Sequence, residues 1–286
     1  MPDTLPPTPL FHYSSLAGLK EILDNQSLWL TSLDQQTDLN TALLFIKSVI
    51  TTNYPGVSLD LFTMDRINQL PVYSFSLTTK KDLPSQWQKY NPQNAYSYSF
   101  DSGQLSALAN NTGLALLKCI YDDREKADFT TNSIVKISPD DYAQSVQQDD
   151  PTCPLDPRHP MFIKQIKLIN RNILNSIGTL KDAALQQEQE YRIAATYTWS
   201  EILGGPGDTD PEPLPLEVKS AVSNGVSFNY LEAPLITGVF TAVNISEVVI
   251  GPSADINQSK LDCENVLAEQ CNPNVVISES SVPFAS

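Results

Sequence analysis

Two short motifs, far apart in the chain, carry the side chains best suited to hold a nucleotide. The first is Phe11-His12-Tyr13, which precedes a helical pattern, and the second is Glu188-Gln189-Glu190-Tyr191-Arg192. An imidazole can hydrogen-bond a ribose hydroxyl through one nitrogen while the backbone holds the other. A fixed carboxylate can stabilise positive charge that develops on a sugar, as in glycoside cleavage. A histidine early in the chain and an acid late in it are therefore the main candidates for a functional site.

The surrounding patterns place both motifs at strand edges. Four apolar residues at helical spacing predict a helix directly after His12, with Ser14 or Ser15 as its N-cap. Strands are expected at Ser27–Ser32, Pro71–Leu77, Ala95–Phe100, Leu114–Tyr121, Tyr191–Trp199, Val226–Tyr230, Leu235–Val239, Glu247–Ile250 and Val275–Ser278. Further helices are expected at Thr41–Ile50, Leu59–Leu70, Leu83–Tyr90, Met161–Ala184 and Asn257–Glu269. This irregular order predicts an α+β fold in one domain, 10–286, after an extended tail at 1–9.

Composition narrows the class of protein. The 286 residues include 33 acidic and 18 basic side chains, so the formal net charge is −15. Such a surface disfavours sequence-independent binding of duplex nucleic acid, although a local patch could still bind one nucleotide. A nuclease is the least favoured function, because no clustered carboxylate motif of the two-metal type is present. No long apolar run is present, which predicts that the chain does not span a membrane. The four cysteines are scattered and the start of the chain lacks a secretory signal, which predicts a cytoplasmic protein with reduced thiols and no metal site.

Four motifs occur in an order that spans nearly the whole chain. They are the F-H-Y-S-S-L opening, the Ser74-Phe75-Ser76 strand followed by Trp87 and Tyr90, the E-x-E-Y-R strand, and the ending Ile245–Pro252 with its following helix and strand. In this order they resemble a large bacterial family known as domain of unknown function 2971 (DUF2971). The opening also resembles that of DNA-modifying ADP-ribosyltransferase toxins, in which a histidine precedes a short helix. The resemblance implies an ADP-ribosyltransferase-like fold of split mixed β-sheets flanked by helices, and a setting such as a toxin or phage-defence effector.

ADP-ribosyltransferases share an early His or Arg, a middle strand with Tyr or S-x-S, and a late strand with Glu, often as E-x-E. The resemblance maps the first element onto His12 and the last onto Glu188 and Glu190. The middle element maps onto Ser74 and Ser76, or onto Tyr73, because a His start and an S-x-S middle belong to different subfamilies. It then implies Glu190 as the catalytic carboxylate and Glu188 as the group that orients or deprotonates an acceptor.

Aromatic and hydroxyl side chains near these motifs could contact NAD, which would be the substrate rather than a resident cofactor. The residues expected to bind it are His12, Tyr13, Tyr73, Ser74, Ser76, Trp87 and Tyr90. Each also has a simpler interpretation. Glu190 and Arg192 could form an ordinary ion pair on one strand face, His12 could be a satisfied polar group, and the aromatic residues could fill the core.

The sequence thus predicts an NAD-dependent ADP-ribosyltransferase or NAD glycohydrolase. Its acceptor is an unknown macromolecule, a protein or a nucleic acid, or else water. The alternative is a non-catalytic protein-interaction module on a nucleotide-binding scaffold, whose acidic surface would suit a basic protein partner.

Overall fold

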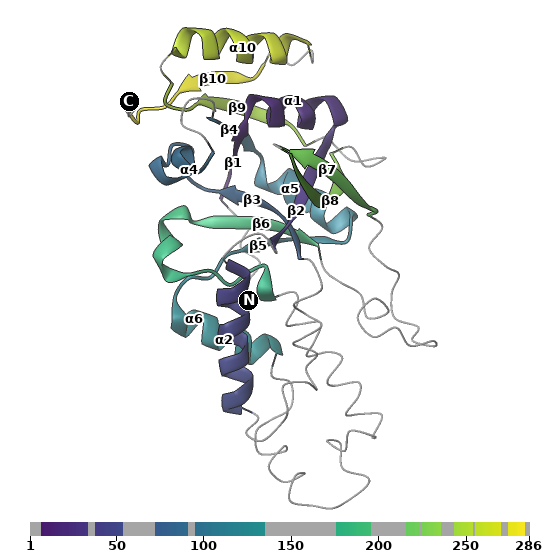
Figure 1. Cartoon of the computed structure of the whole chain (residues 1–286), viewed down its shortest axis with the longest axis vertical. Helices are drawn as coiled ribbons and strands as arrows, with labels where there is room; N and C mark the ends of the chain where they lie inside the picture. Colours follow the sequence, from purple (N-terminus) through teal and green to yellow (C-terminus); the bar gives the residue numbers. More distant parts are fainter. Residues whose placement is uncertain are drawn as a thin grey trace, which may run out of the picture.

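The computed structural model describes residues 7–33, 38–53, 72–90, 95–134, 176–195, 216–223, 225–235, 243–253, 255–269 and 274–283. Over these ranges the chain forms one large sheet with helices around it, which confirms the predicted α+β class (Figure 1). The strands are β1 Leu10–Ser15, β2 Ser27–Ser32, β3 Tyr73–Thr78, β4 Ala95–Phe100, β5 Leu114–Lys118, β6 Glu190–Ala195, β7 Val218–Ser223, β8 Val226–Pro234, β9 Ile245–Ile250 and β10 Val276–Glu279. The helices are α1 Leu16–Asn25, α2 Asp38–Asn53, α4 Pro84–Lys89, α5 Ser102–Asn111, α6 Asp123–Ile134 and α10 Ile256–Glu269, with a 3₁₀ turn, η3, at Ala183–Glu188.

The sheet is mixed and connected rather than divided into two. Its strand order is β10-β9-β4-β1-β3-β2-β8-β7, with β6 on the second edge of β3 and β5 on β6. Only β9 and β10 are parallel among the strand pairs that the structure describes. The separate sheets implied by the ADP-ribosyltransferase resemblance are therefore corrected to one hydrogen-bonded network.

That network nevertheless opens at one place. Since β6 occupies one edge of β3 along its length, β1 and β2 must share the other edge. β1 meets that edge only at Phe11 opposite Thr78, whereas β2 meets it at Tyr73 and Ser74. Between these contacts neither β1 nor β2 pairs with β3, so the backbone around Ser76 faces the gap where β1 and β2 diverge.

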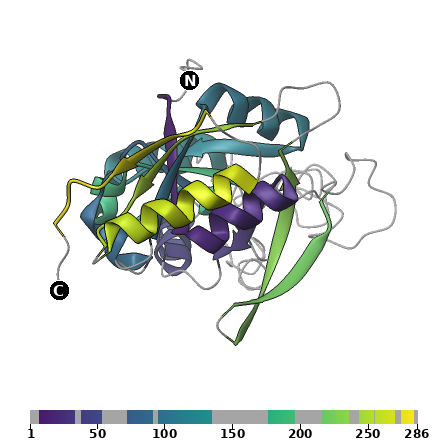
Figure 2. The ribbon, with the colours of Figure 1, turned by 90° about the horizontal axis from the view of Figure 1, so that it is seen from above.

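Helix α1 lies beside this gap because it begins directly after β1. Ser15 is its N-cap, and the Ser15 hydroxyl accepts a hydrogen bond from the Gly18 N–H at 3.1 Å, as the sequence predicts. The apolar face of α1 is buried in the main core through Leu19, Ile22 and Leu23. α10 runs along α1 on the same side of the sheet (Figure 2), so this side is covered by helices.

The opposite face of the sheet carries a smaller core. Its members are Trp87 of α4 and the strand residues Phe11, Tyr13, Ala95 and Val249. Trp87 donates its indole N–H to Asp82 at 2.7 Å and packs edge-on against Tyr13, with 4.6 Å between ring centroids. Trp87 is held there by α4, a short helix with a proline at its start.

Gly251 lets the chain pass close to this smaller core. A Cβ at Gly251 would lie 2.7 Å from the Ala95 carbonyl oxygen and 2.9 Å from Cε3 of the Trp87 ring. Gly251→Ala is therefore expected to lower the free energy of unfolding by about 1–3 kcal/mol, the range for overpacking. Gly178→Ala is the control, because its Cβ would meet the nearest atom at 3.6 Å. Chemical denaturation of both variants measures the difference, and equal stabilities would contradict the steric argument.

Several expectations differ from the structure. α5, α6 and β7 are not among the predicted elements. The predicted strand Leu114–Tyr121 ends at Lys118, and among the described strands β5 pairs with β6 alone, so it is not a central strand. The expected strand Leu235–Val239 is not one at its start, because β8 ends at Pro234 and Leu235 is a bend. The helix Leu59–Leu70, most of Met161–Ala184 and residues 1–6 of the tail lie outside the described residues.

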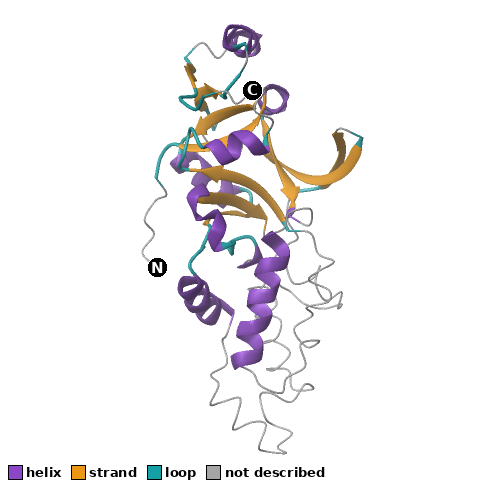
Figure 3. Ribbon diagram, turned by 60° about the vertical axis from the view of Figure 1, so that its left-hand side comes forward, coloured by secondary structure: helices purple, strands orange, loops and turns teal. Residues whose placement is uncertain are grey.

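The β7–β8 hairpin extends away from the body of the sheet (Figure 3). β8 pairs with β2 from Tyr230 to Pro234, and its first four residues pair only with β7. The resulting two-stranded arm contributes Ala221, Val222 and Phe228 to the lining of the gap that β1 and β2 leave at the edge of β3. Within the described ranges no helix is both long enough and apolar enough to cross a membrane.

Candidate functional site

A cavity of about 570 Å³ lies at the open edge of β3. Its walls come from β1, the start of α1, β2, β3, β4, Tyr90 after α4, and the β7–β8 arm. The lining residues are His12, Ser14, Ser15, Ala17, Gly18, Glu21, Ile22, Trp29, Thr31, Ser74, Phe75, Ser76, Tyr90, Tyr98, Ala221, Val222 and Phe228. Its size and its aromatic side chains are those of a small-molecule site, and about half of its lining residues are polar.

His12 is held in one orientation at the inner wall of this cavity. Its ring stacks on Phe75 with 4.0 Å between centroids, and its Nδ1 lies 2.7 Å from the Ser76 carbonyl oxygen. A carbonyl oxygen only accepts, so Nδ1 must carry the proton and donate it to Ser76. Nε2 is then an acceptor, and no residue in the described part of the chain satisfies it. His12 therefore presents a neutral, pre-oriented acceptor to a ligand.

Burial lowers the pKa of His12 to about 4, against an ordinary value of 6.5, and the Ser76 hydrogen bond only partly offsets this. The chain has two histidines, so proton NMR of the ring C–H signals can follow each, with His12→Asn to assign them. We expect the His12 signal to titrate near pH 4. Because the unfolded chain binds this proton more readily, His12 reduces stability as the pH falls from about 6.5 to 4. A midpoint near 6.5 would contradict the neutral ring.

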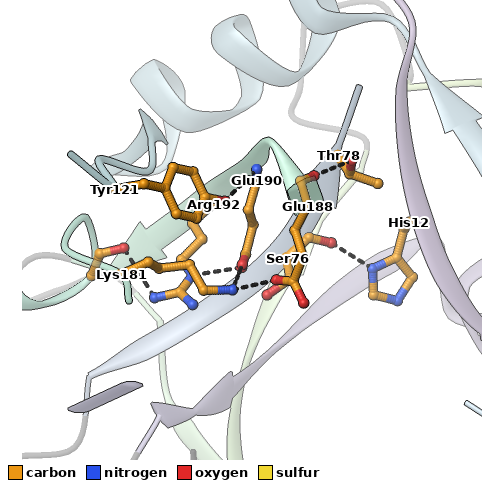
Figure 4. Close-up of polar contacts among 9 residues, drawn as sticks. His12, Ser76, Thr78, Tyr121, Lys181, Glu188, Glu190 and Arg192 are labelled. Carbon is orange, nitrogen blue, oxygen red and sulfur yellow. Dashed lines mark hydrogen bonds and ion pairs between the residues drawn. The ribbon is translucent and has the colours of Figure 1, made fainter. Parts of the chain in front are cut away.

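The two glutamates of the E-x-E motif converge on one buried ion cluster (Figure 4). Glu188 binds the Lys181 ammonium at 2.5 Å, and Glu190 binds the same ammonium through Oε2. The other oxygen of Glu190, Oε1, accepts from Nε of Arg192 at 2.6 Å. Arg192 is fully buried and also donates to the Gly178 carbonyl oxygen at 3.2 Å. Both oxygens of Glu190 are therefore engaged.

The ion cluster keeps Glu190 charged. Burial favours the neutral acid, but Arg192 and Lys181 outweigh it and lower the pKa of Glu190 to about 2. Burial likewise opposes the charge on Lys181, and the two carboxylates raise the pKa of this ammonium above its ordinary value. The ion pair that the sequence offered as the simpler interpretation of Glu190 and Arg192 is thus present, and it is buried rather than solvated.

His12 and Glu190 approach the gap from opposite faces of the sheet. His12 lies opposite Tyr98 and shares its face, which belongs to the main core, whereas the neighbouring Phe11 points into the smaller core. Phe11 and Glu190 both lie opposite Thr78, so Glu190 shares the face of Phe11. The prediction of one open site with His12 and Glu190 on either side of a ligand is therefore corrected, because the two side chains lie on opposite faces of the sheet.

A second, much smaller cavity lies on the face of Glu190. Its lining consists of Phe11, Tyr13, Ser76, Leu77, Thr78, Gln86, Lys89, Tyr90, Glu188 and Glu190. Ser76 and Tyr90 line both cavities, so the two are neighbours across the gap. In Figure 4, Ser76 and Glu188 lie between His12 and Lys181. Of the two acids, Glu188 is the one with an oxygen that has no partner among the described residues.

The structure separates the other expected ligand contacts into two groups. Ser74, Ser76 and Tyr90 line the large cavity. Tyr73 and Trp87 line neither cavity, since Tyr73 belongs to the main core and Trp87, 1 % exposed, to the smaller one. The Tyr13 hydroxyl is committed to the chain, because it donates to the Lys80 carbonyl oxygen and accepts from the Leu83 N–H.

Most of the large cavity's lining lies outside the predicted site residues, Trp29, Tyr98 and Phe228 among it, and so does Lys181 in the ion cluster. Trp29 and Tyr98 stand on expected strands, but which strands would adjoin the gap is a matter of topology. Lys181 follows a turn and has no motif around it. Two carboxylates buried together do, however, require a cation, and this requirement is what could have indicated a basic residue beside the E-x-E motif.

Comparison of the chain with protein-family models, with curated proteins and with solved structures gave no match. The resemblance to DUF2971 and to ADP-ribosyltransferases therefore stays a prediction from the motifs.

Proposed function

We propose that this protein binds NAD in the large cavity and cleaves its nicotinamide–ribose bond, as an ADP-ribosyltransferase or an NAD glycohydrolase. The observation that carries the proposal is His12, a neutral imidazole whose proton is fixed on Nδ1 and whose Nε2 is left to accept a ribose hydroxyl. The first turn of α1, with Ser15, Ala17 and Gly18, lines the same cavity. Backbone N–H groups at the start of a helix suit a pyrophosphate.

In this reaction the C1′–N bond breaks and nicotinamide leaves with its electron pair. An acceptor hydroxyl, amine or water then forms a bond to C1′ and loses a proton. A carboxylate near the ribose stabilises the positively charged transition state more strongly than it stabilises the bound substrate. We assign that part to Glu188 rather than to Glu190, because Glu188 has an oxygen without a partner among the described residues. Glu190 then orients the Lys181 ammonium that holds Glu188.

The test is nicotinamide release from NAD, followed by chromatography for the parent protein and matched variants. Glu188→Gln is expected to lower turnover by roughly 10²–10³-fold, the usual effect of removing one group that stabilises transition-state charge. His12→Ala is expected to weaken NAD binding, and Glu125→Gln, an exposed site on α6, should change neither. Intact NAD with water and with broad protein and nucleic-acid acceptors, or equal turnover by Glu188→Gln, would refute the proposal.

A second candidate function is a non-catalytic nucleotide-binding module that contacts a protein partner. The observation favouring it is that both oxygens of Glu190 are engaged in a buried cluster. In that case NAD should raise the melting temperature of the protein, as any ligand of the folded state does, without release of nicotinamide. The net charge of −15 would then suit a partner with a basic surface.

A further inference from the structure

Three polar groups at the small cavity have no hydrogen-bond partner among the described residues. They are the second carboxylate oxygen of Glu188 and the hydroxyls of Ser76 and Tyr90. Thr78 also lines this cavity, but its hydroxyl is committed to the chain, because it donates to the Glu188 carbonyl oxygen at 2.5 Å and accepts from the Lys80 N–H at 3.0 Å. The three groups are therefore available to a molecule that the cavity holds.

These groups come from separate elements that meet at the gap. The side chain of Ser76 points to the face of the sheet that carries Glu190, while its carbonyl oxygen holds His12 in the gap. Glu188 ends η3 just before β6, and Tyr90 follows α4. Burial, and after it the nearby Glu190 and Glu188 carboxylates, raises the pKa of Tyr90 to about 12. Its hydroxyl is therefore protonated at neutral pH and can donate a hydrogen bond.

The small cavity has room for one water molecule. Its volume is about 20 Å³, and a polar cavity needs about 10–15 Å³ and two to four partners to hold a water. The Glu188 oxygen accepts, and the two hydroxyls can donate or accept, so the partners are present. A protein side chain or a nucleobase is larger than this space. Such an acceptor would have to enter through the large cavity, where we expect NAD itself to lie.

We propose that the small cavity holds the water molecule that attacks C1′ of NAD, so that this protein is a hydrolase that releases free ADP-ribose. Ser76 and Tyr90 line both cavities, so a water bound to them borders the ribose of a ligand in the large cavity. The water oxygen forms a bond to C1′, the C1′–N bond breaks, and nicotinamide leaves with its electron pair. Glu188 accepts one proton of the water and later releases it to the solvent.

The inference rests on the proposed function for NAD, and the fate of the ADP-ribose tests it. NAD labelled in its adenylate phosphate is incubated with the full chain and an excess of a basic protein, single-stranded DNA or RNA. We expect the label to appear as free ADP-ribose, at a rate that none of these acceptors changes. Label bound to an acceptor refutes water as the acceptor and leaves NAD cleavage standing. Intact NAD in every mixture refutes cleavage itself, and the inference with it.

Ser76→Ala and Tyr90→Phe each remove one partner of the water. At saturating NAD each should lower the rate of ADP-ribose release by about three- to tenfold, the value of one ordinary hydrogen bond. Ser85→Ala is the matched control for the serine. The Ser85 hydroxyl is also buried without a partner among the described residues, but Ser85 lies on α4 and lines neither cavity. It should release ADP-ribose at the parent rate.

Methanol gives a second measurement, because it needs space for one methyl group more than water does. The parent protein should form little methyl ADP-ribose, whereas Ser76→Ala enlarges the cavity and should raise the ratio of methanolysis to hydrolysis several-fold. This ratio does not depend on the fraction of the protein that is folded, so partial unfolding of a variant cannot produce the change. If Ser76→Ala and Tyr90→Phe match Ser85→Ala in both rate and ratio, the attacking water is not held in this cavity and the inference is wrong.

Discussion

Lys181→Met is expected to destabilise the protein by about 3–5 kcal/mol, the cost of removing one partner from a buried ion pair. Lys181 is nearly inaccessible to solvent and neutralises both Glu188 and Glu190. Without it Arg192 still compensates Glu190, but the Glu188 carboxylate is left buried beside another negative charge. The measurement is urea denaturation monitored by circular dichroism.

Lys126→Met provides a matched control for this loss. Lys126 is equally buried, yet its partner Asp123 is 79 % exposed and is hydrated when the lysine is removed. A cost within about 1 kcal/mol is expected there, since the exposed Asp123 keeps its hydration without the lysine and a pair with one solvated partner contributes little. The double variant Lys181→Met with Glu188→Gln should recover part of the stability, because the uncompensated charge is removed with the cation. If Lys181→Met costs no more than Lys126→Met, the cluster does not hold the site together.

The same cluster sets a dependence of stability on pH. Glu190 has a pKa of about 2 in the folded protein and an ordinary value of 4.5. Its contribution is therefore complete above about pH 4.5 and is lost as the pH falls toward 2, where the folded protein must also take up the proton. Glu190→Gln should remove most of the acid sensitivity in this window, in the same denaturation measurement repeated from pH 5 to 2.

The comparison of sequence and structure shows which features local patterns can predict. The strand that carries His12, the helix after it and its Ser15 cap follow from apolar spacing and one polar residue, which act within a few residues of each other. The E-x-E strand and the strand with Ser74 and Ser76 were also correctly located. These features depend on periodicity alone.

The relation between the two motifs depended on long-range pairing instead. Thr78 lies opposite both Phe11 and Glu190, and this register decides that Glu190 and His12 occupy opposite faces. A shift of one residue would have reversed the result, and nothing near either motif specifies the register. The same holds for Lys181, which reaches the cluster through the fold.

Trp87→Ala is expected to destabilise the protein by about 3–5 kcal/mol while leaving NAD affinity unchanged. Trp87 is 1 % exposed, and it packs on Tyr13 and donates to Asp82. Asp82 also accepts from the Ser280 hydroxyl at 2.6 Å and from the Ser281 N–H at 2.7 Å, so the indole supports the end of the described chain as well. Truncation would open a cavity at the meeting point of these segments.

The sequence motif assigned Trp87 to the ligand, and Trp29→Leu distinguishes the two interpretations. Trp29 lines the large cavity, so its loss should weaken NAD binding by several-fold at a smaller cost in stability, because its indole is partly exposed already. Calorimetric titration and denaturation of both variants give a crossed pattern if the structure is right. Trp87 then acts on folding and Trp29 on binding. Should Trp87→Ala lose binding while its unfolding free energy stays at the parent value, the indole contacts the ligand, and the smaller core has been given the wrong role.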